Sequence, residues 1–392
     1  MRNLVRTPAF VLSVVLAAGA AATPAAAARS PLPWDHAGYD AENSYYNPHE
    51  TVITAATVGR LARKWSVKLR TAEDCSGFGA PVVSGGRVFV GDQAGISAYS
   101  AATGARAWSF DWDDFGTGWP PRLTVVGRLL IAGYGDCYSV SDPNTHMVAL
   151  DAATGARRWA GVPPIGDLVV DKGVILASGT DITGETAAAA YRVRDGRELW
   201  RVKNRRVAAV SAGGTVVAVA TDDEGVRTGE SVALDIASGA VRWTTKTYLS
   251  ADAASPADDA FYGADADGGL AAVGVADGTV RWRAPAPADP NERIATDGAR
   301  VYRSCLKTVT ALDARTGKRL WSRKLANDTG QPRVAGGLVF AGNFALDARR
   351  GTVVGRVPAV AGDIVVAGGV LYQAKEGVLS AYAPRPAAAP RP

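Results

Sequence analysis

The sequence predicts an all-β protein, an eight-bladed β-propeller built from four-stranded antiparallel blades. An eleven-residue pattern, with Gly in its middle and Trp at its end, recurs along the 392 residues. It returns about every 40 residues, which is the length of one four-stranded propeller blade. Before each copy stand two short apolar runs joined by a turn, as in "APVVSGGRVFVG" (80–91), and such pairs are typical of β-hairpins.

The copies align on their glycine. They are "AYSAATGARAW" (98–108), "ALDAATGARRW" (149–159), "AYRVRDGRELW" (190–200), "ALDIASGAVRW" (233–243), "AVGVADGTVRW" (272–282), "ALDARTGKRLW" (311–321) and "ALDARRGTVVG" (345–355). In the first six copies Trp follows Gly by four residues, whereas in the seventh Gly355 takes the place of Trp.

Each copy is predicted to span the third strand of a blade, a tight turn and the outermost strand. An Asp at the end of the third strand can bond the turn backbone, and Gly can adopt the positive φ of the turn. Trp on the outermost strand offers a large apolar surface to the neighbouring blade. A feature present in every blade cannot mark a single site, so the tryptophans are assigned a structural role. They are Trp65, Trp108, Trp159, Trp200, Trp243, Trp282 and Trp321.

The strand count predicts how the ring closes. Hairpins begin near residues 80, 121, 166, 206, 253, 292, 331 and 362, but outer strands end only near 108, 159, 200, 243, 282, 321 and 355. One outer strand is therefore missing from the last blade. The unpaired strand "LARKWSVKL" (61–69) near the N-terminus is expected to complete that blade, which would leave the sheet sequence without an open end.

The first residues have the pattern of a secretory signal peptide. Arg2 and Arg6 precede an apolar run, and Ala26, Ala27 and Ala28 precede Arg29, so cleavage is expected after Ala28. We expect a secreted protein with no membrane span, because no later stretch approaches roughly 18 apolar residues. Residues 29–60 are expected to lead into the propeller, which covers residues 61–383. The Pro- and Ala-rich residues 384–392 are expected to form a loose tail.

Charge argues against a nucleic-acid partner. Without residues 1–28, the chain keeps 41 of its 43 Lys and Arg residues against 38 Asp and Glu residues. This balance lacks the basic excess of nucleic-acid-binding domains. We expect a monomer.

The repeat, together with "WDHAGYDAENSYYNPHETVITAATVGRLARKW" (34–65), resembles a known family over nearly the whole mature chain. The family comprises the eight-bladed propellers of quinoprotein alcohol dehydrogenases and their non-enzymatic relatives, including the outer-membrane assembly factor of the β-barrel machinery. The resemblance implies the architecture. It leaves the activity open, because the family contains enzymes, scaffolds and sensor domains.

The residues that the resemblance would require of an enzyme are mostly absent. Quinoprotein alcohol dehydrogenases typically carry adjacent cysteines beside the quinone, carboxylates and an amide around calcium, and in some members a Cys-x-x-Cys-His haem site. The cysteines here, Cys75, Cys137 and Cys305, are not adjacent, and the only histidines are His36, His49 and His146. "DADGG" (265–269) lacks the spaced ligands of a calcium loop and is interpreted as a polar hairpin turn. No cofactor or metal is predicted, and pyrroloquinoline quinone (PQQ) with calcium is the alternative.

Long loops of the first two blades form the predicted ligand-binding face. Strand direction alternates within a blade, so the connections between blades and the second-to-third-strand loops share one face. There the sequence gathers acids and aromatics suited to a polar or cationic ligand, a sugar or a peptide, although these aromatics could simply cap the end of the propeller. The residues are Asp74, Phe78, Trp112, Asp113, Asp114, Phe115, Trp119, Asp136, Tyr138 and His146.

Two classes of function follow. The favoured one is a secreted, non-catalytic protein that binds an extracellular protein, peptide or glycan, since no nucleophile with a positioned base can be recognised. The alternative is a secreted PQQ-dependent dehydrogenase with a divergent site, or another propeller enzyme such as a lyase. Export also permits one disulfide, and Cys75 with Cys137 is the expected pair because both lie in loops of one face on adjacent blades. The other possibility is that all three cysteines are reduced.

Overall fold

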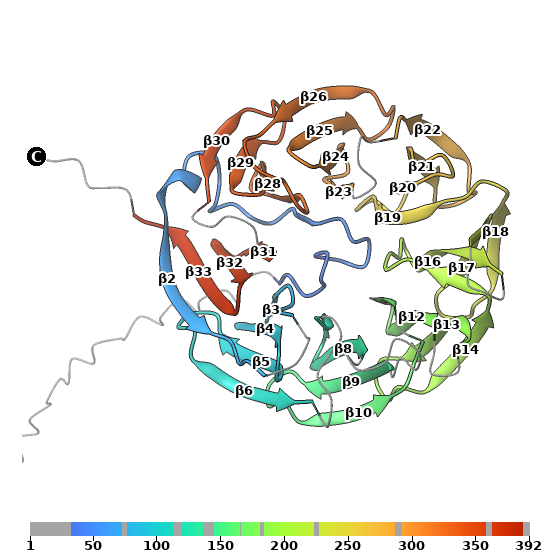
Figure 1. The fold of residues 1–392 in the computed structure, drawn as a ribbon, viewed down its shortest axis with the longest axis horizontal. Coiled ribbons are helices and arrows are strands. Elements are labelled where there is room, and N and C mark those ends of the chain that lie inside the picture. The colour runs from blue at the N-terminus through green and yellow to red at the C-terminus, as the bar shows by residue number, and fades with distance from the viewer. Residues whose placement is uncertain are drawn as a thin grey trace, which may run out of the picture. The chain divides into compact units, whose positions relative to one another are not determined.

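Eight sheets follow one another around a ring in chain order (Figure 1). The computed structural model describes residues 33–72, 77–112, 120–135, 145–164, 166–180, 184–222, 227–286, 292–357 and 363–386. Within these residues each sheet is one blade, and its strands A, B, C and D run outward from the axis to the rim. The predicted eight-bladed propeller is confirmed.

Blades 1 to 4 each use four consecutive strands. Blade 1 contains β3 (Val82–Ser84), β4 (Arg87–Asp92), β5 (Gly95–Ser100) and β6 (Arg106–Asp111). Blade 2 contains β7 (Arg122–Val126), β8 (Leu129–Gly135), β9 (Thr145–Asp151) and β10 (Arg157–Gly161). Blade 3 contains β11 (Asp167–Asp171), β12 (Val174–Thr180), β13 (Thr186–Arg192) and β14 (Glu198–Lys203). Blade 4 contains β15 (Arg205–Val207), β16 (Thr215–Thr221), β17 (Arg227–Asp235) and β18 (Val241–Thr245).

Blades 5 to 7 continue the series, and blade 8 draws on both ends of the chain. Blade 5 contains β19 (Ser250–Ala254), β20 (Ala260–Ala264), β21 (Leu270–Gly274) and β22 (Val280–Ala284). Blade 6 contains β23 (Arg293–Thr296), β24 (Arg300–Cys305), β25 (Thr308–Asp313) and β26 (Arg319–Lys324). Blade 7 contains β27 (Arg333–Ala335), β28 (Leu338–Ala341), β29 (Phe344–Asp347) and β30 (Val353–Arg356). Blade 8 contains β31 (Asp363–Ala367), β32 (Val370–Lys375), β33 (Val378–Pro384) and β2 (Leu61–Lys68).

The ring closes through β2, the outer strand of blade 8. β2 runs antiparallel to β33, from the pair Leu61 and Pro384 to the pair Lys68 and Val378. The short helical turn η1 (Val58–Arg60) precedes β2 and packs against β30 and β33. Blade 7 differs from the four-stranded pattern because the two-residue strand β1 (Tyr46–Asn47) pairs in parallel with β27.

Burial follows the position of a strand within its blade. Every residue of β16 is buried, because a strand in the middle of a blade is covered on both faces by neighbouring blades. The outer strand β2 alternates between partly buried and exposed side chains over its second half. The core is thus divided into layers between successive blades. No helix within the described residues has the length and apolar character needed to cross a bilayer.

The tryptophans join each blade to the next. The indole nitrogen of Trp108 donates to the carbonyl of Ala152 at 3.1 Å, and its ring lies 2.7 Å from the place that a Cβ atom on Gly155 would occupy. Gly155 has a φ of 76°, so both its backbone conformation and the ring above it require glycine. The same contact recurs between Trp65 and Gly104, Trp159 and Gly196, Trp200 and Gly239, Trp243 and Gly278, Trp282 and Gly317, and Trp321 and Gly351.

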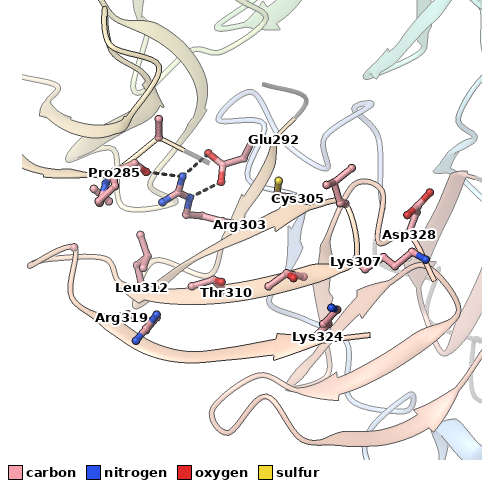
Figure 2. Close-up of a pocket in the computed structure, with 15 residues that line it drawn as sticks. Pro285, Glu292, Arg303, Cys305, Lys307, Thr310, Leu312, Arg319, Lys324 and Asp328 are labelled. Atoms are coloured by element: carbon pink, nitrogen blue, oxygen red, sulfur yellow. Dashed lines mark hydrogen bonds and ion pairs between the residues drawn. The ribbon is translucent and has the colours of Figure 1, made fainter. Parts of the chain in front are cut away.

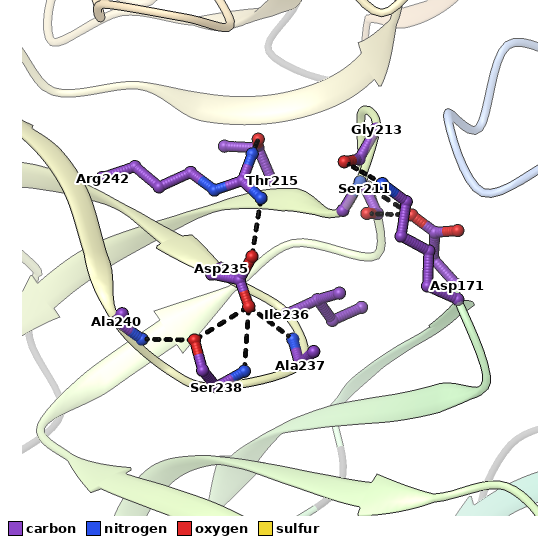
Figure 3. Close-up of polar contacts among 12 residues, drawn as sticks. Asp171, Ser211, Gly213, Thr215, Asp235, Ile236, Ala237, Ser238, Ala240 and Arg242 are labelled. Carbon is purple, nitrogen blue, oxygen red and sulfur yellow. Dashed lines mark hydrogen bonds and ion pairs between the residues drawn. The ribbon is translucent and has the colours of Figure 1, made fainter.

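The Asp of the repeat shapes the turn between strands C and D. In blade 4, Oδ1 of Asp235 accepts hydrogen bonds from the backbone N–H groups of Ala237 and Ser238, at 3.1 and 2.9 Å (Figure 3). Its Oδ2 accepts one from Arg242 on β18 at 2.6 Å. Nearby, Asp171 of blade 3 accepts a hydrogen bond from Ser211 of blade 4 at 2.7 Å. The repeated Asp therefore has a structural role, because it stabilises the turn between strands C and D.

Candidate functional site

The axis of the ring is occupied by the N-terminal segment, which we call the axial segment (residues 34–50). It passes the blades in order and makes a hydrogen bond to strand A, or the residues beside it, in every one of them (Figure 1). The pairs from blade 1 to blade 8 are Trp34 with Val83, Asp35 with Val125, His36 with Val170, Ala41 with Ser211, Glu42 with Ala254, Ser44 with Thr296, Tyr45 with Val334, and Asn47 with Val366.

The sequence offered little sign of this arrangement. The axial segment has neither the alternation of a strand nor the period of a helix, and Tyr39, Asn43 and Tyr45 have positive φ angles of 83°, 52° and 53°. Some of its backbone groups are satisfied by turns within the segment, such as the 2.8 Å bond from the N–H of Tyr45 to the carbonyl of Gly38, and others by the inner strands. The inner-strand partners come together only in the closed ring.

Partly buried ionisable groups lie along the axial segment. The Nδ1 atom of His36 is 2.7 Å from a carboxylate oxygen of Asp35, and Nε2 is 3.1 Å from the carbonyl of Val170. Burial alone would lower the pKa of His36, but the hydrogen bond and charge of Asp35, the carbonyl of Val170 and the charge of Asp40 together raise it. Burial raises the pKa of Asp40 to about 6, although hydrogen bonds from Ser44 oppose the rise. Burial, with Asp40 nearby, also raises the pKa of Glu42.

Beside the axial segment lies a cavity of about 250 Å³, which we call the axial funnel. Asn43 and Tyr45 line it together with residues at or just before the start of the inner strands of blades 2, 3, 5, 6 and 7, and with residues that follow β15 in blade 4. Most of the lining thus lies on the face of the connections between blades. The inner-strand residues and those next to them include Arg122, Asp167, Ala208, Ala209, Val210, Ser250, Ala251, Asp252, Glu292, Arg293, Ile294 and Gln331.

The charges of the axial funnel are largely paired. Arg122 of blade 2 lies 3.3 Å from Asp167 of blade 3, and Glu292 accepts two hydrogen bonds from Arg303 of its own blade. The amide of Gln331 donates to the carbonyl of Ile294 at 2.7 Å. These contacts hold the charged and amide groups that line the axial funnel in fixed positions. Such an arrangement suits recognition of a polar partner.

The predicted ligand-binding face is described only in part. Asp74, Asp113, Asp114, Phe115, Trp119, Asp136 and Tyr138 lie outside the described residues, and so do Cys75 and Cys137 of the predicted disulfide. Cys305 is the last residue of β24 in blade 6.

Trp112 and His146 are brought together by a residue that the sequence did not single out. The ring of Tyr134, from β8, lies 4.1 Å from that of Trp112 and 5.1 Å from that of His146, with centroids as reference points. Phe78 lies elsewhere, because its ring is 3.0 Å from the place of a Cβ atom on Gly377 in blade 8. Tyr134 was missed because it belongs to an apolar strand whose pattern indicates only burial.

The described carboxylates do not fit a calcium site. Within the described residues, no group of three or more His, Cys, Asp or Glu side chains could hold a metal ion. In the axial funnel, Asp167 and Glu292 already bind arginines, so a calcium ion there would have to displace a guanidinium group. "DADGG" forms the turn between β20 and β21, where Asp265 accepts backbone hydrogen bonds from Asp267 and Gly269.

Comparison with known proteins gives the family. A family model described as "Outer membrane protein assembly factor BamB" matches residues 50–164 and 184–385, well over half of the chain. The chain belongs to this family. The match spans the outer strand β2 and all seven copies of the repeat, and of the strands in the blades it leaves out only β11 and β12 of blade 3, so membership rests on the propeller itself.

The chain also shows similarity to an enzyme in sequence. The chain is 29% identical over 188 residues to a quinohemoprotein alcohol dehydrogenase of Comamonas testosteroni, covering 45% of the chain but only 26% of that relative. The chain thus spans about a quarter of the length of this curated relative.

Solved structures show the same fold. A quinohemoprotein alcohol dehydrogenase of Pseudomonas putida HK5 matches with a TM-score of 0.66 and 14% identity, over 92% of this chain and 82% of that one. BamB of Moraxella catarrhalis matches with a TM-score of 0.59 and 18% identity, over 84% of this chain and 99% of that one. At these identities the likeness concerns the fold.

Proposed function

We propose that this propeller is an exported, non-catalytic binding protein that holds an extracellular protein or peptide segment, or a glycan, on the face around the axial funnel. The observation that carries this proposal is the axial segment, which occupies the axis and bonds to all eight blades. It leaves the axial funnel beside it, a small cavity with a largely polar lining. Such a rigid surface can recognise a partner without rearranging.

The charged and amide side chains of the axial funnel support binding of a polar partner. Arg122, Asp167 and Glu292 present charges held by ion pairs, and Asn43 and Gln331 add amides. Within the described residues, the axial funnel contains no Ser, Cys or Thr hydrogen-bonded to a His that could act as its base. The signal-like residues 1–28 support export.

One observation favours a second function. The similarity to a quinohemoprotein alcohol dehydrogenase supports a PQQ-dependent dehydrogenase with a divergent site as the alternative. Bound quinone would supply the oxidation chemistry of such an enzyme. The paired carboxylates of the axial funnel weigh against it, and a lyase or other propeller enzyme lacks even this support.

Site-specific photo-crosslinking tests the binding function. A photoreactive amino acid at Arg293, exposed at the axial funnel, should give discrete higher-mass adducts when the protein is secreted by its own organism. The same group at Thr316, exposed on the opposite face in a repeated turn, is the matched control. Equal adduct patterns at both positions would contradict the proposal.

Cofactor titration tests the alternative. PQQ and Ca²⁺ should change the melting temperature of the mature protein little, whereas a ligand at 100 times its dissociation constant adds about 2.7 kcal/mol. A clear rise in the melting temperature together with alcohol-dependent dye reduction would favour the PQQ-dependent dehydrogenase over the binding protein.

A further inference from the structure

A cavity of about 870 Å³ opens between blades 5 and 6, toward the rim of the ring (Figure 2). We call it the rim cavity. One wall is the end of β22 with Pro285 and Ala286, and the other is the face of blade 6 that carries Arg303, Thr310 and Leu312. Its volume is in the range of small-molecule and peptide pockets. None of the described residues that line it is aromatic.

The rim cavity has an excess of positive charge. Its acids are Glu292, which is bonded to Arg303, and Asp328. Its remaining cations are Lys307, Arg319 and Lys324, all exposed, and within the described residues none of them has a carboxylate at ion-pair distance. Figure 2 shows Arg319 and Lys324 toward opposite ends of β26, alongside Thr310 and Leu312 of β25.

Blade 5 shows that these free cations are not needed for the fold, because Val280 and Pro285 occupy there the positions that Arg319 and Lys324 have relative to the repeated Trp. The residue before the repeated Trp is Arg158 in blade 2 and Arg242 in blade 4, and each binds the Asp of its own repeat, at 2.7 and 2.6 Å. In blade 6 that position is Leu320. Asp313 there accepts hydrogen bonds from its own turn, including one from Thr316 at 2.8 Å, and within the described residues it forms no ion pair with Arg319 or Lys324.

The spacing of the cations indicates the shape of the ligand. Arg319 and Lys324 are five residues apart on a strand, and a strand rises about 3.3 Å per residue, so their Cα atoms are roughly 16 Å apart. One small anion cannot reach both side chains. An extended peptide with two acidic side chains four residues apart can, because side chains an even number of residues apart share one face of a strand and the long Arg and Lys side chains span the remaining distance. Thr308, Thr310 and Leu312 would lie beneath its middle.

We infer that the rim cavity binds an extended acidic peptide segment of a partner protein. Charge complementarity and the strand-like spacing carry the inference, and the absence of an aromatic platform among the lining residues favours a peptide over a sugar chain. The site is additional to the proposed binding at the axial funnel. Glu292 lies between the two cavities and is held by Arg303.

The chain contains a matched control for the test. On β2, Arg63 and Lys68 occupy the same positions relative to Trp65 as Arg319 and Lys324 do relative to Trp321, and all four charged side chains are exposed. The double variants R319Q/K324Q and R63Q/K68Q therefore remove equal charge from equivalent positions, but only the first changes the rim cavity.

The probe is a fluorescein-labelled nonapeptide with Glu at positions 2 and 6, which share one face of an extended chain, and Leu and Thr between them. Its binding is measured by fluorescence anisotropy in about 50 mM salt, where charge screening is weak. R319Q/K324Q should weaken binding at least about tenfold, and R63Q/K68Q less than about twofold. Thr310→Trp, which fills the cavity without changing charge, should also weaken it at least about tenfold, with Thr310→Met as the substitute if the larger side chain lowers the melting temperature.

Four results would overturn the inference. The first is an equal loss in both double variants, which would show diffuse attraction to the rim. The second is undiminished binding to folded cavity-filling variants, and the third is equal binding of a peptide with Gln in place of Glu. The fourth is tighter binding of an oligogalacturonate than of the acidic peptide. Crosslinking at Arg293 is a separate measurement, so failure of the proposed function would be recognised independently.

Discussion

The Cγ1 atom of Val58 lies 2.7 Å from the place that a Cβ atom on Gly355 would occupy. Gly355 stands where the other repeats carry Trp, and the blade that follows it has no turn between strands C and D, because its outer strand comes from the N-terminus. At this one junction, η1 packs against β30. The missing Trp thus makes room for the segment that closes the ring.

Gly355→Ala should therefore destabilise the fold. The added methyl group would press on Val58, which is fully buried, and overpacking of this kind costs about 1–3 kcal/mol. Val58→Ala in the same chain should recover part of the loss, giving a coupling energy of about 1 kcal/mol in a double-mutant cycle from denaturant unfolding. Gly161→Ala on β10, where no atom lies within 4 Å of the added group, is the control. Equal effects at both glycines would disprove the steric relationship.

Trp65→Ala should lower the free energy of unfolding by about 3 kcal/mol or more, as truncation of a packed Trp does. Trp65 donates to the carbonyl of Ala101 at 3.1 Å and covers Gly104, so it fastens blade 8 to blade 1. Trp200→Ala, at an internal junction, should cost a similar amount. A large loss for Trp200→Ala with almost none for Trp65→Ala would mean that β2 does not close the ring. Deleting residues 29–70 should be more damaging than either substitution.

Glu50→Ala should be more destabilising than its position in an irregular segment suggests. The buried carboxylate of Glu50 accepts hydrogen bonds from the N–H groups of Val52, Ile53 and Gly369 at 2.8, 2.9 and 3.0 Å. Removing it leaves three N–H groups without their acceptor, at an expected cost of about 2–4 kcal/mol. Glu50→Gln keeps one acceptor oxygen and should cost less. If thermal unfolding showed a larger loss of stability for Glu50→Gln than for Glu50→Ala, this role would be refuted.

Asp40 should make stability fall as pH rises from about 4 to about 6. Burial raises its pKa, so in this window the folded protein keeps a proton that the unfolded chain has lost, and rising pH then favours unfolding. The free energy of unfolding of wild type relative to Asp40→Asn should decline across the window and become constant above it. Glu42→Gln should remove a further decline at higher pH, because the pKa of Glu42 is raised too. A pH-independent difference between wild type and Asp40→Asn would contradict the assignment.

The disulfide between Cys75 and Cys137 stays a prediction, since both residues lie outside the described ranges. Peptide mapping of the secreted protein without reduction should recover the two as one linked pair. Recovery of both as free thiols, or of Cys305 in a bridge, would refute the pairing.

The blades could be predicted from sequence because their interactions repeat locally. Asp235 and Gly239 lie within one turn, and Trp200, which ends the preceding repeat, packs on that turn. The contact therefore recurs with the period of the sequence and can be predicted from it. The candidate site is different. Tyr134, which joins Trp112 to His146, has the pattern of any buried strand residue, and the first residues of the inner strands gave no sign that they would line a common funnel.

By itself, therefore, the sequence determined the number of blades, the residues that fasten them and the strand that closes the ring. Tertiary structure decided what lies on the axis and which charges are paired. Glu50 and Gly369 are 319 residues apart, and the rim cavity forms only where the end of β22 in blade 5 lies beside blade 6. Periodicity records contacts that every repeat makes, whereas contacts made once, between segments distant in the chain, come into existence only when the ring is complete.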